Sequence, residues 1–100
     1  MLIYHIVTPE IWEKFKDETN YEADSLQSEG FIHCSYRHQL DGVLERYYKN
    51  QSKVLLLHIN PHLLTAKFIA ERSTGGEVYP HIYGKINVNA VVETEEKFLR

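Results

Sequence analysis

The pattern of hydrophobic and polar positions divides the chain into short apolar runs and two amphipathic stretches. The apolar runs predict strands at 2–7, 31–34, 54–59, 66–70, 78–83 and 86–94. A stripe at i, i+3, i+4, i+7 and i+8 predicts a helix with one core-facing side, made of Leu40, Val43, Leu44, Tyr47 and Tyr48. A second helix is predicted after Thr8, because a capping oxygen is followed by Pro9 and an acid in the first turn.

The order of these elements indicates the fold class. Residues 54–59 are almost continuously aliphatic, which is typical of a central strand buried on both faces. Residues 21–29 show no clear period and are predicted to form a surface loop, and residues 72–76 a glycine-containing turn. With two helices in the first half and mostly strands in the second, we expect one α+β domain over residues 1–100, with a small mixed or antiparallel sheet.

Composition limits which binding partners and which cellular compartment we expect for the protein. A net charge of −3 argues against general nucleic-acid binding, which needs a basic patch. Cys34 is the single cysteine, so no intramolecular disulfide can form. The first residues lack the basic lead of a signal peptide, and the longest aliphatic run is too short to span a bilayer. We therefore expect a cytoplasmic protein without a membrane segment.

Two histidines in predicted strands are the first candidates for chemistry. Strand alternation places His33 on the same face as Phe31, opposite Ile32 and Cys34, so Cys34 is predicted to be a core residue. If the two strands are neighbours, His5 and His33 can point into one cleft and act as acid, base or hydrogen-bond donor. Alternatively, each ring is partly buried and held by a backbone partner, which is the commoner role for one histidine considered alone.

The strand that contains His33 ends at Ser35, which suits the cap of the next helix. A helix start offers free N–H groups and a positive dipole end, so the turn over residues 35–37 is a candidate cradle for a phosphate or carboxylate. Arg37 can add a bidentate contact to such a group. The alternative is a simple capping serine beside a solvated surface arginine.

A further candidate follows a pair of glycines. Glu77 lies directly after Gly75 and Gly76, where a carboxylate can stabilise developing positive charge or hold a sugar hydroxyl. Its neighbours combine an apolar body with a polar tip, which suits ligand binding: Tyr79, His81 and Tyr83. The alternatives are an ordinary loop acid and a histidine ring in the core.

A three-histidine metal site is a separate alternative. His5, His33 and His81 are the candidates for a triad such as that of an open zinc site. Because no paired spacing of the H-x-x-x-H kind supports it, we expect no metal.

Three segments together resemble the bacterial family known as domain of unknown function 952. They are Ile3–Ile6, Gly30–Ser35 with the string Gly-Phe-Ile-His-Cys-Ser, and Gly75–Gly84 with the string Pro-His-Ile-Tyr-Gly. The resemblance extends from Leu2 to about Val92. It implies membership of the ADP-ribosyltransferase-like superfamily, whose fold has a split β-sheet and an NAD-type cleft.

The same resemblance implies roles for three residues. His5 would hold the nicotinamide-side ribose, His33 (or, less well matched, Ser35) would orient or stack on the nicotinamide, and Glu77 would bind the ribose 2′-hydroxyl as an oxocarbenium-like centre forms. The leading hypothesis is binding of NAD or a related nucleotide, with cleavage or transfer at the glycosidic bond. The alternatives are a non-enzymatic module that binds a small molecule or a protein, and the three-histidine metal site.

Overall fold

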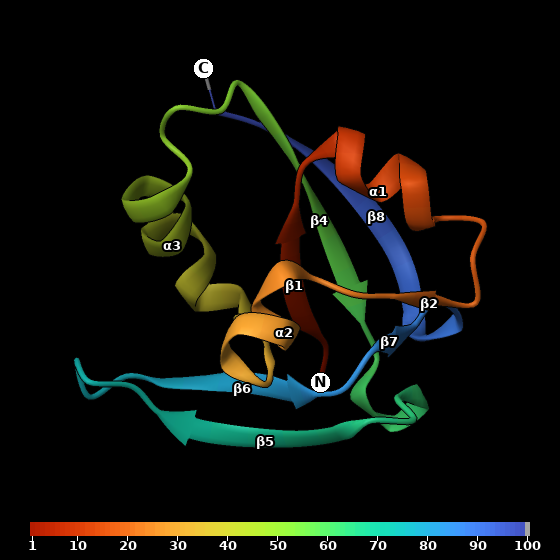
Figure 1. Cartoon of the computed structure of the whole chain (residues 1–100). Coiled ribbons are helices and arrows are strands. Elements are labelled where there is room, and N and C mark those ends of the chain that lie inside the picture. Colours follow the sequence, from red (N-terminus) through yellow and green to blue (C-terminus); the bar gives the residue numbers. More distant parts are fainter. Residues whose placement is uncertain (100) are drawn as a thin grey trace.

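A computed structural model describes residues 1–99, and it is an α+β fold built on three small antiparallel sheets (Figure 1). The largest sheet has the order β1 (Ile3–Val7), β4 (Lys53–Ile59) and β8 (Val91–Phe98). The aliphatic strand β4 lies in the centre, as its sequence predicts. In this position the strand forms backbone hydrogen bonds along both edges, and both of its faces are covered by other parts of the protein.

The two faces of this sheet carry two separate apolar cores, because side chains alternate along each strand. One core contains Ile3 and Val7 of β1, Leu57 and Ile59 of β4, and the buried Trp12. The other core lies on the opposite face and contains Tyr4, Ile6, Val54, Leu56, Leu40 and Leu44. The alternation predicted for the first strand is therefore confirmed.

Two predicted helices are present on either side of this sheet. Helix α1 (Pro9–Phe15) begins at Thr8, whose Oγ1 accepts a hydrogen bond from the Ile11 N–H at 3.4 Å. Helix α3 (Leu40–Tyr47) follows a 3₁₀ turn at Arg37–Gln39. Tyr47 was predicted to face the core but is 73 % exposed. The other four positions of the stripe do pack in one core, with Leu40 and Leu44 buried and Val43 and Tyr48 partly buried against them.

The predicted loop over residues 21–29 is wrong. This stretch contains the end of strand β2 (Asn20–Tyr21) and the six-residue helix α2 (Asp24–Glu29), so the first half has three α-helices instead of two. Helix α2 ends at Gly30, whose φ of 89° favours glycine. No residue of α2 is fully buried, so the helix leaves no apolar period in the sequence.

The other two sheets lie beside the first. Strand β6 (Val78–Tyr83) pairs with β5 (Lys67–Arg72) on one side and with the short β3 (Ile32–His33) on the other. Strand β2 pairs with β7 (Ile86–Asn87). The single strand predicted over residues 86–94 is interrupted by a 3₁₀ turn at Val88–Ala90, which separates β7 from β8.

Ser35 joins two of the sheets and does not cap a helix, which corrects the prediction. Its N–H donates to the carbonyl of Tyr4 at 2.7 Å, and the Tyr4 N–H donates to the Ser35 carbonyl at 2.8 Å. Extended pairing with β1 carries the chain past Ser35, and the next turn starts after Tyr36. Within residues 1–99, no helix has the length and hydropathy needed to cross a membrane.

Candidate functional site

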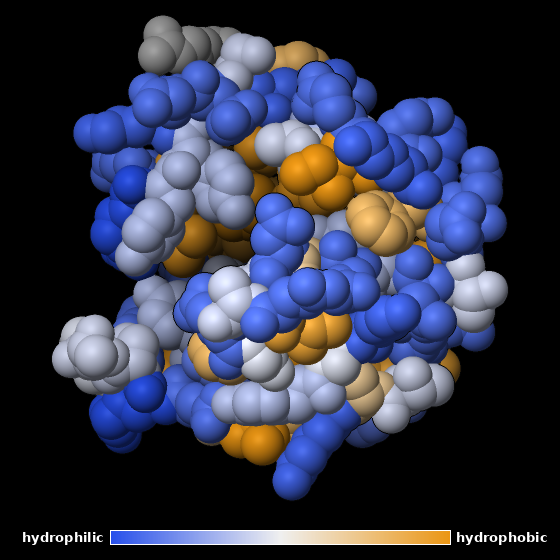
Figure 2. Space-filling model, viewed as in Figure 1, coloured by the Kyte–Doolittle hydropathy of each residue, from blue (hydrophilic) through white to orange (hydrophobic). Residues whose placement is uncertain are grey.

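A cleft of about 590 Å³ opens over β1, bordered by α1, by the segment that leads into α2, and by the end of α3. Figure 2 shows a hollow with apolar residues at its bottom between these helices. The volume lies in the range of about 300–1,000 Å³ that is common for small-molecule sites. Among the residues that line it are His5, Phe15, Tyr21, His33, Ser35, Val43 and Tyr48.

His5 is fixed at the bottom of the cleft by two hydrogen bonds. Its Nδ1 lies 2.7 Å from the carbonyl oxygen of His33, which can only accept, so Nδ1 carries the hydrogen. The Nε2 atom then accepts from the hydroxyl of Tyr21 at 2.8 Å. Burial lowers the pKa of His5 to about 4, which outweighs the opposite effect of the backbone hydrogen bond. Burial also raises the pKa of Tyr21.

The cleft therefore has an uncharged polar pair in its floor. Both nitrogens of His5 are engaged within the protein, and the ring is neutral near pH 7. In this position the ring ties β1 to the strands that contain Tyr21 and His33. It can present a fixed dipole to a ligand, but it has no free nitrogen with which to accept a proton.

Two further hydroxyl groups belong to residues that line the cleft, those of Ser35 and Tyr48. Ser35 is only 5 % exposed and lines the cleft. Among residues 1–99 its hydroxyl forms no hydrogen bond to another residue, and no fully buried side-chain oxygen lacks a partner, so its Oγ keeps some accessible surface. Tyr48, which follows α3, also lines the cleft, and burial raises its pKa. These hydroxyls can donate or accept hydrogen bonds.

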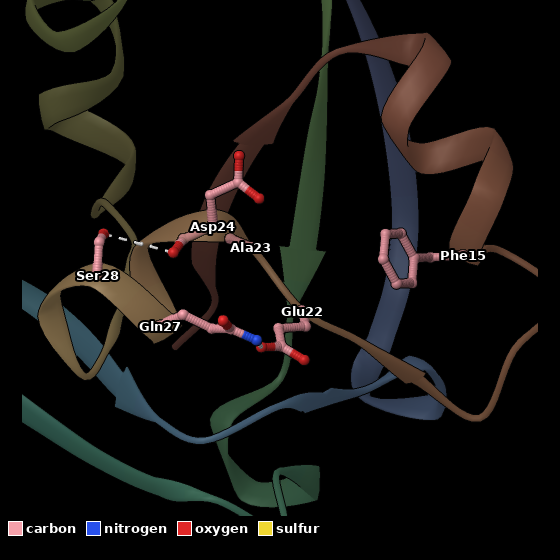
Figure 3. Close-up of a pocket in the computed structure, with 6 residues that line it drawn as sticks. All are labelled: Phe15, Glu22, Ala23, Asp24, Gln27 and Ser28. Atoms are coloured by element: carbon pink, nitrogen blue, oxygen red, sulfur yellow. Dashed lines mark hydrogen bonds between the residues drawn. The ribbon is translucent and has the colours of Figure 1, made fainter.

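Charged side chains lie at the rim. Lys14 comes from α1, and Glu22 and Asp24 come from the segment before and at the start of α2. The carboxylate of Glu22 accepts from the Gln27 amide at 3.3 Å and lies 3.9 Å from Lys85 Nζ. The carboxylate of Asp24 extends away from helix α2 (Figure 3).

His33 and His81 belong to a second group, on the outer face of the sheet formed by β3, β6 and β5. They are paired directly across β3 and β6, and their ring centroids are 5.5 Å apart. Nδ1 of His81 donates to Glu71 at 2.7 Å, and Nε2 of His33 lies 3.2 Å from Glu29. The ring of Phe31 stacks on His81 with a centroid distance of 4.1 Å. We call these five residues the outer cluster.

His5 and His33 both line the cleft, as the sequence predicts, but the two rings have different surroundings. Ile32 and Cys34 point into the core on one face of β3, so alternation sends the His33 ring to the other face with Phe31. His33 reaches His5 only through its main-chain carbonyl. Within residues 1–99, no three histidine, cysteine or acidic side chains are placed to hold a metal ion.

The remaining predicted residues lie elsewhere. Glu77 is exposed in the turn between β5 and β6, where its carbonyl accepts from the Ser73 N–H at 2.7 Å. Four residues of extended strand, about 13 Å, separate it from His81. The Tyr83 hydroxyl donates to Glu71, next to the outer cluster, and the Tyr79 hydroxyl accepts from Arg46 at 3.0 Å.

Arg37 is engaged on the face of the largest sheet opposite the Trp12 core. Its guanidinium lies 3.5 Å from a carboxylate oxygen of Glu95 and 5.4 Å from the ring centre of Tyr4. The adjoining element is a 3₁₀ turn of only three residues, and it does not provide the helix N-terminus that the prediction assumed. The predicted anion cradle over residues 35–37 is therefore not formed, because Ser35 is paired as a strand and Arg37 is turned to an acid.

Sequence reasoning missed several residues of the cleft. Tyr21, Glu22 and Asp24 fall in the segment without a period, which gave no signal beyond the unusual number of tyrosines. Tyr48 was assigned to the helical stripe, where an aromatic residue normally indicates a core position. Tyr48 does pack against the core of Leu40 and Leu44, as the stripe predicts, and it lines the cleft as well.

Comparisons with known proteins identify the family. The family described as protein of unknown function DUF952 matches residues 6–94, and the chain belongs to it. A crystal structure of protein CC0527 from Caulobacter crescentus, a structural genomics target, is 27% identical, covers 96% of this chain and 85% of that chain, and has a TM-score of 0.86. The solution NMR structure of CC0527 is also 27% identical, with coverage of 94% and 82% and a TM-score of 0.76. No curated relative matches the chain.

These comparisons establish the family and the α+β fold shared with CC0527. The ADP-ribosyltransferase-like superfamily stays a prediction, as do its cofactor and the roles it implies for His5, His33 and Glu77.

Proposed function

We propose that the cleft over β1 binds a small organic molecule through a planar heteroaromatic ring, such as the nicotinamide or nucleobase of a nucleotide. The observation that carries this proposal is Ser35, a residue that is only 5 % exposed, lines the cleft, and has a hydroxyl without a hydrogen bond to another of residues 1–99. An unpaired hydroxyl in such a nearly enclosed position is a natural contact for a polar group of a ligand.

The surroundings of Ser35 suit a flat ring. Phe15, Tyr21 and Tyr48 contribute aromatic side chains to the same cleft, and aromatic rings favour offset or edge-on contacts with another ring. The floor adds no net charge, since the His5–Tyr21 pair is neutral. NAD is the ligand that the family resemblance suggests, and its nicotinamide is a ring of this kind.

The geometry supports binding better than group transfer. Transfer at a glycosidic bond, as the resemblance implies it, would need His5, His33 and Glu77 around one ligand. His5 and His33 line the cleft, although the His33 ring also contacts the outer cluster, whereas Glu77 lies outside the cleft in the β5–β6 turn. We therefore expect saturable binding without turnover, and no loss of affinity in the variant Glu77→Gln.

Titration of the protein with NAD, nicotinamide mononucleotide and adenosine monophosphate, followed by amide chemical shifts, tests the proposal. We expect saturable shifts around Ser35, Val43 and Tyr48. The variant Ser35→Ala should weaken binding about five- to tenfold, since one hydrogen bond contributes about 1 kcal/mol. Ser73→Ala, in the distant β5–β6 turn, is the matched control. Unchanged shifts near Ser35 and Tyr48 at millimolar concentrations of all three ligands and their parent nucleosides would rule the proposal out.

A further inference from the structure

A second depression of about 530 Å³ adjoins the cleft, and both are bordered by the same short segment. Phe15, Glu22, Ala23 and Asp24 line both depressions, and Gln27 and Ser28 of α2 line the second one (Figure 3). Residues 22–24, which we call the ridge, thus separate the two spaces. A ligand whose ring lies against Ser35 in the cleft can reach the ridge with the group attached to that ring.

The ridge is the acidic part of this combined surface. Glu22 and Asp24 are its carboxylates, and Lys14, on the opposite side of the cleft, is the only lysine or arginine that lines either depression within residues 1–99. Glu22 is oriented by Gln27 and Lys85, so its carboxylate keeps a defined position. His5 contributes no positive charge, because burial lowers its pKa to about 4.

We infer that the cleft selects a nucleoside over the corresponding 5′-phosphate, with the ring in the cleft beside Ser35 and the sugar hydroxyls donating to Glu22 and Asp24 on the ridge. This inference rests on the proposed function and names the ligand class of the same site.

Hydrogen-bond chemistry gives the direction of the selection. An ionised carboxylate only accepts hydrogen bonds, and the vicinal hydroxyls of ribose are donors that can meet two carboxylate oxygens. A phosphate also only accepts in its ionised form, and it would bring negative charge to a wall with two carboxylates, of which only that of Glu22 has a lysine, Lys85, at 3.9 Å. Like charges placed together at a binding surface weaken binding and suppress the wrong partner.

Matched pairs of ligands test the inference. Calorimetric titration at low ionic strength compares adenosine with adenosine 5′-monophosphate, and nicotinamide riboside with nicotinamide mononucleotide. We expect each nucleoside to bind at least about tenfold more tightly than its phosphate. Added salt should narrow the difference, because it screens exposed charges. 2′,3′-Dideoxyadenosine, which lacks both hydroxyls, should bind more weakly than adenosine.

The double variant Glu22→Gln and Asp24→Asn tests the ridge itself. It keeps side-chain size and removes both charges, so it should weaken adenosine binding and strengthen binding of the 5′-monophosphate. Glu29→Gln, which removes one carboxylate at the other end of α2 and outside both depressions, is the control for loss of charge away from the ridge. Circular dichroism and amide shifts of the variant show whether α2 is retained.

The outcomes separate the two proposals. If a monophosphate binds as tightly as its nucleoside, or if the double variant leaves the ratio unchanged, the inference is overturned and the proposed function stands. If neither a nucleoside nor a nucleotide perturbs the cleft, the proposed function itself fails.

Discussion

The cleft floor and the outer cluster both contain histidine, but the two regions differ in solvent exposure and in the charge of the hydrogen-bond partners. His5 is 6 % exposed, and its partners are a carbonyl and a tyrosine hydroxyl, both uncharged. The side chain of His33 is 54 % exposed, and its partner is the carboxylate of Glu29. His81 likewise faces the carboxylate of Glu71.

The difference shows that environment, more than residue type, decides what a histidine contributes. In the floor, hydrogen bonds fix a neutral ring, and losing that ring would leave buried partners without a contact. In the outer cluster, the side chains of His33 and Glu29 are about half exposed, so solvent screens their contact and can replace a lost partner, and this pair stabilises the fold only slightly. His81 is less exposed, at 12 % of its side chain.

The largest effect should come from His5→Ala. It removes a buried ring and leaves the His33 carbonyl and the Tyr21 hydroxyl without their partner. We expect the free energy of unfolding to fall by about 4 kcal/mol, from the cavity and the lost hydrogen bonds together. Urea unfolding measures it. His33→Ala, with its exposed ring, should cost less than about 1 kcal/mol. Equal losses in the two variants would contradict the comparison.

The free energy of unfolding should also depend on pH through His5, with a change slightly smaller than that expected for His5→Ala. Burial lowers its pKa in the folded protein from 6.5 to about 4, so the unfolded chain binds more protons between these values. The stabilisation is fully present above pH 6.5 and declines by about 3 kcal/mol as the pH falls toward 4. Unfolding free energies measured from pH 7 to 4.5 should therefore decline, and His5→Gln should flatten the profile. A profile of the same slope in His5→Gln would assign the effect to other groups.

The smallest effect concerns the carboxyl group of Glu71. The hydrogen bond from Tyr83, and then the one from His81, lower its pKa below the ordinary value of 4.5. Carbon-detected NMR titration should show this lowered value, and Tyr83→Phe should move it back toward 4.5. A titration of Glu71 that is the same with and without the Tyr83 hydroxyl would show that this contact is not formed in solution.

Local patterns predicted much of the fold. Alternation in 2–7 and 54–59 separates the two cores correctly, and the stripe that begins at Leu40 locates α3. These patterns are local, because each element only has to turn its apolar side toward a core. The segment 21–29 escaped prediction because α2 buries no residue completely. Its position depends on Tyr21, which is anchored through contacts far away in the sequence.

The site was harder to predict than the fold. His5, His33 and Ser35 do line one cleft, but this depends on the pairing of Tyr4 with Ser35, which no local pattern contains. Glu77 and His81 are close in sequence, yet an extended strand separates them in space. Proximity along the chain was therefore a poor guide, whereas alternation correctly placed Cys34 in the core.

Strand β8 has a consequence for behaviour at high concentration. It is an outer strand of its sheet, so one backbone edge is unpaired, and it exposes Val92 and Phe98. Between them stand Glu93, Glu95 and Glu96, together with one lysine, Lys97. A copy of the same strand aligned along this edge would bring two net acidic strands together, and this repulsion guards against sheet-to-sheet aggregation. The acidity of β8 thus favours the dispersed molecule over a growing fibre.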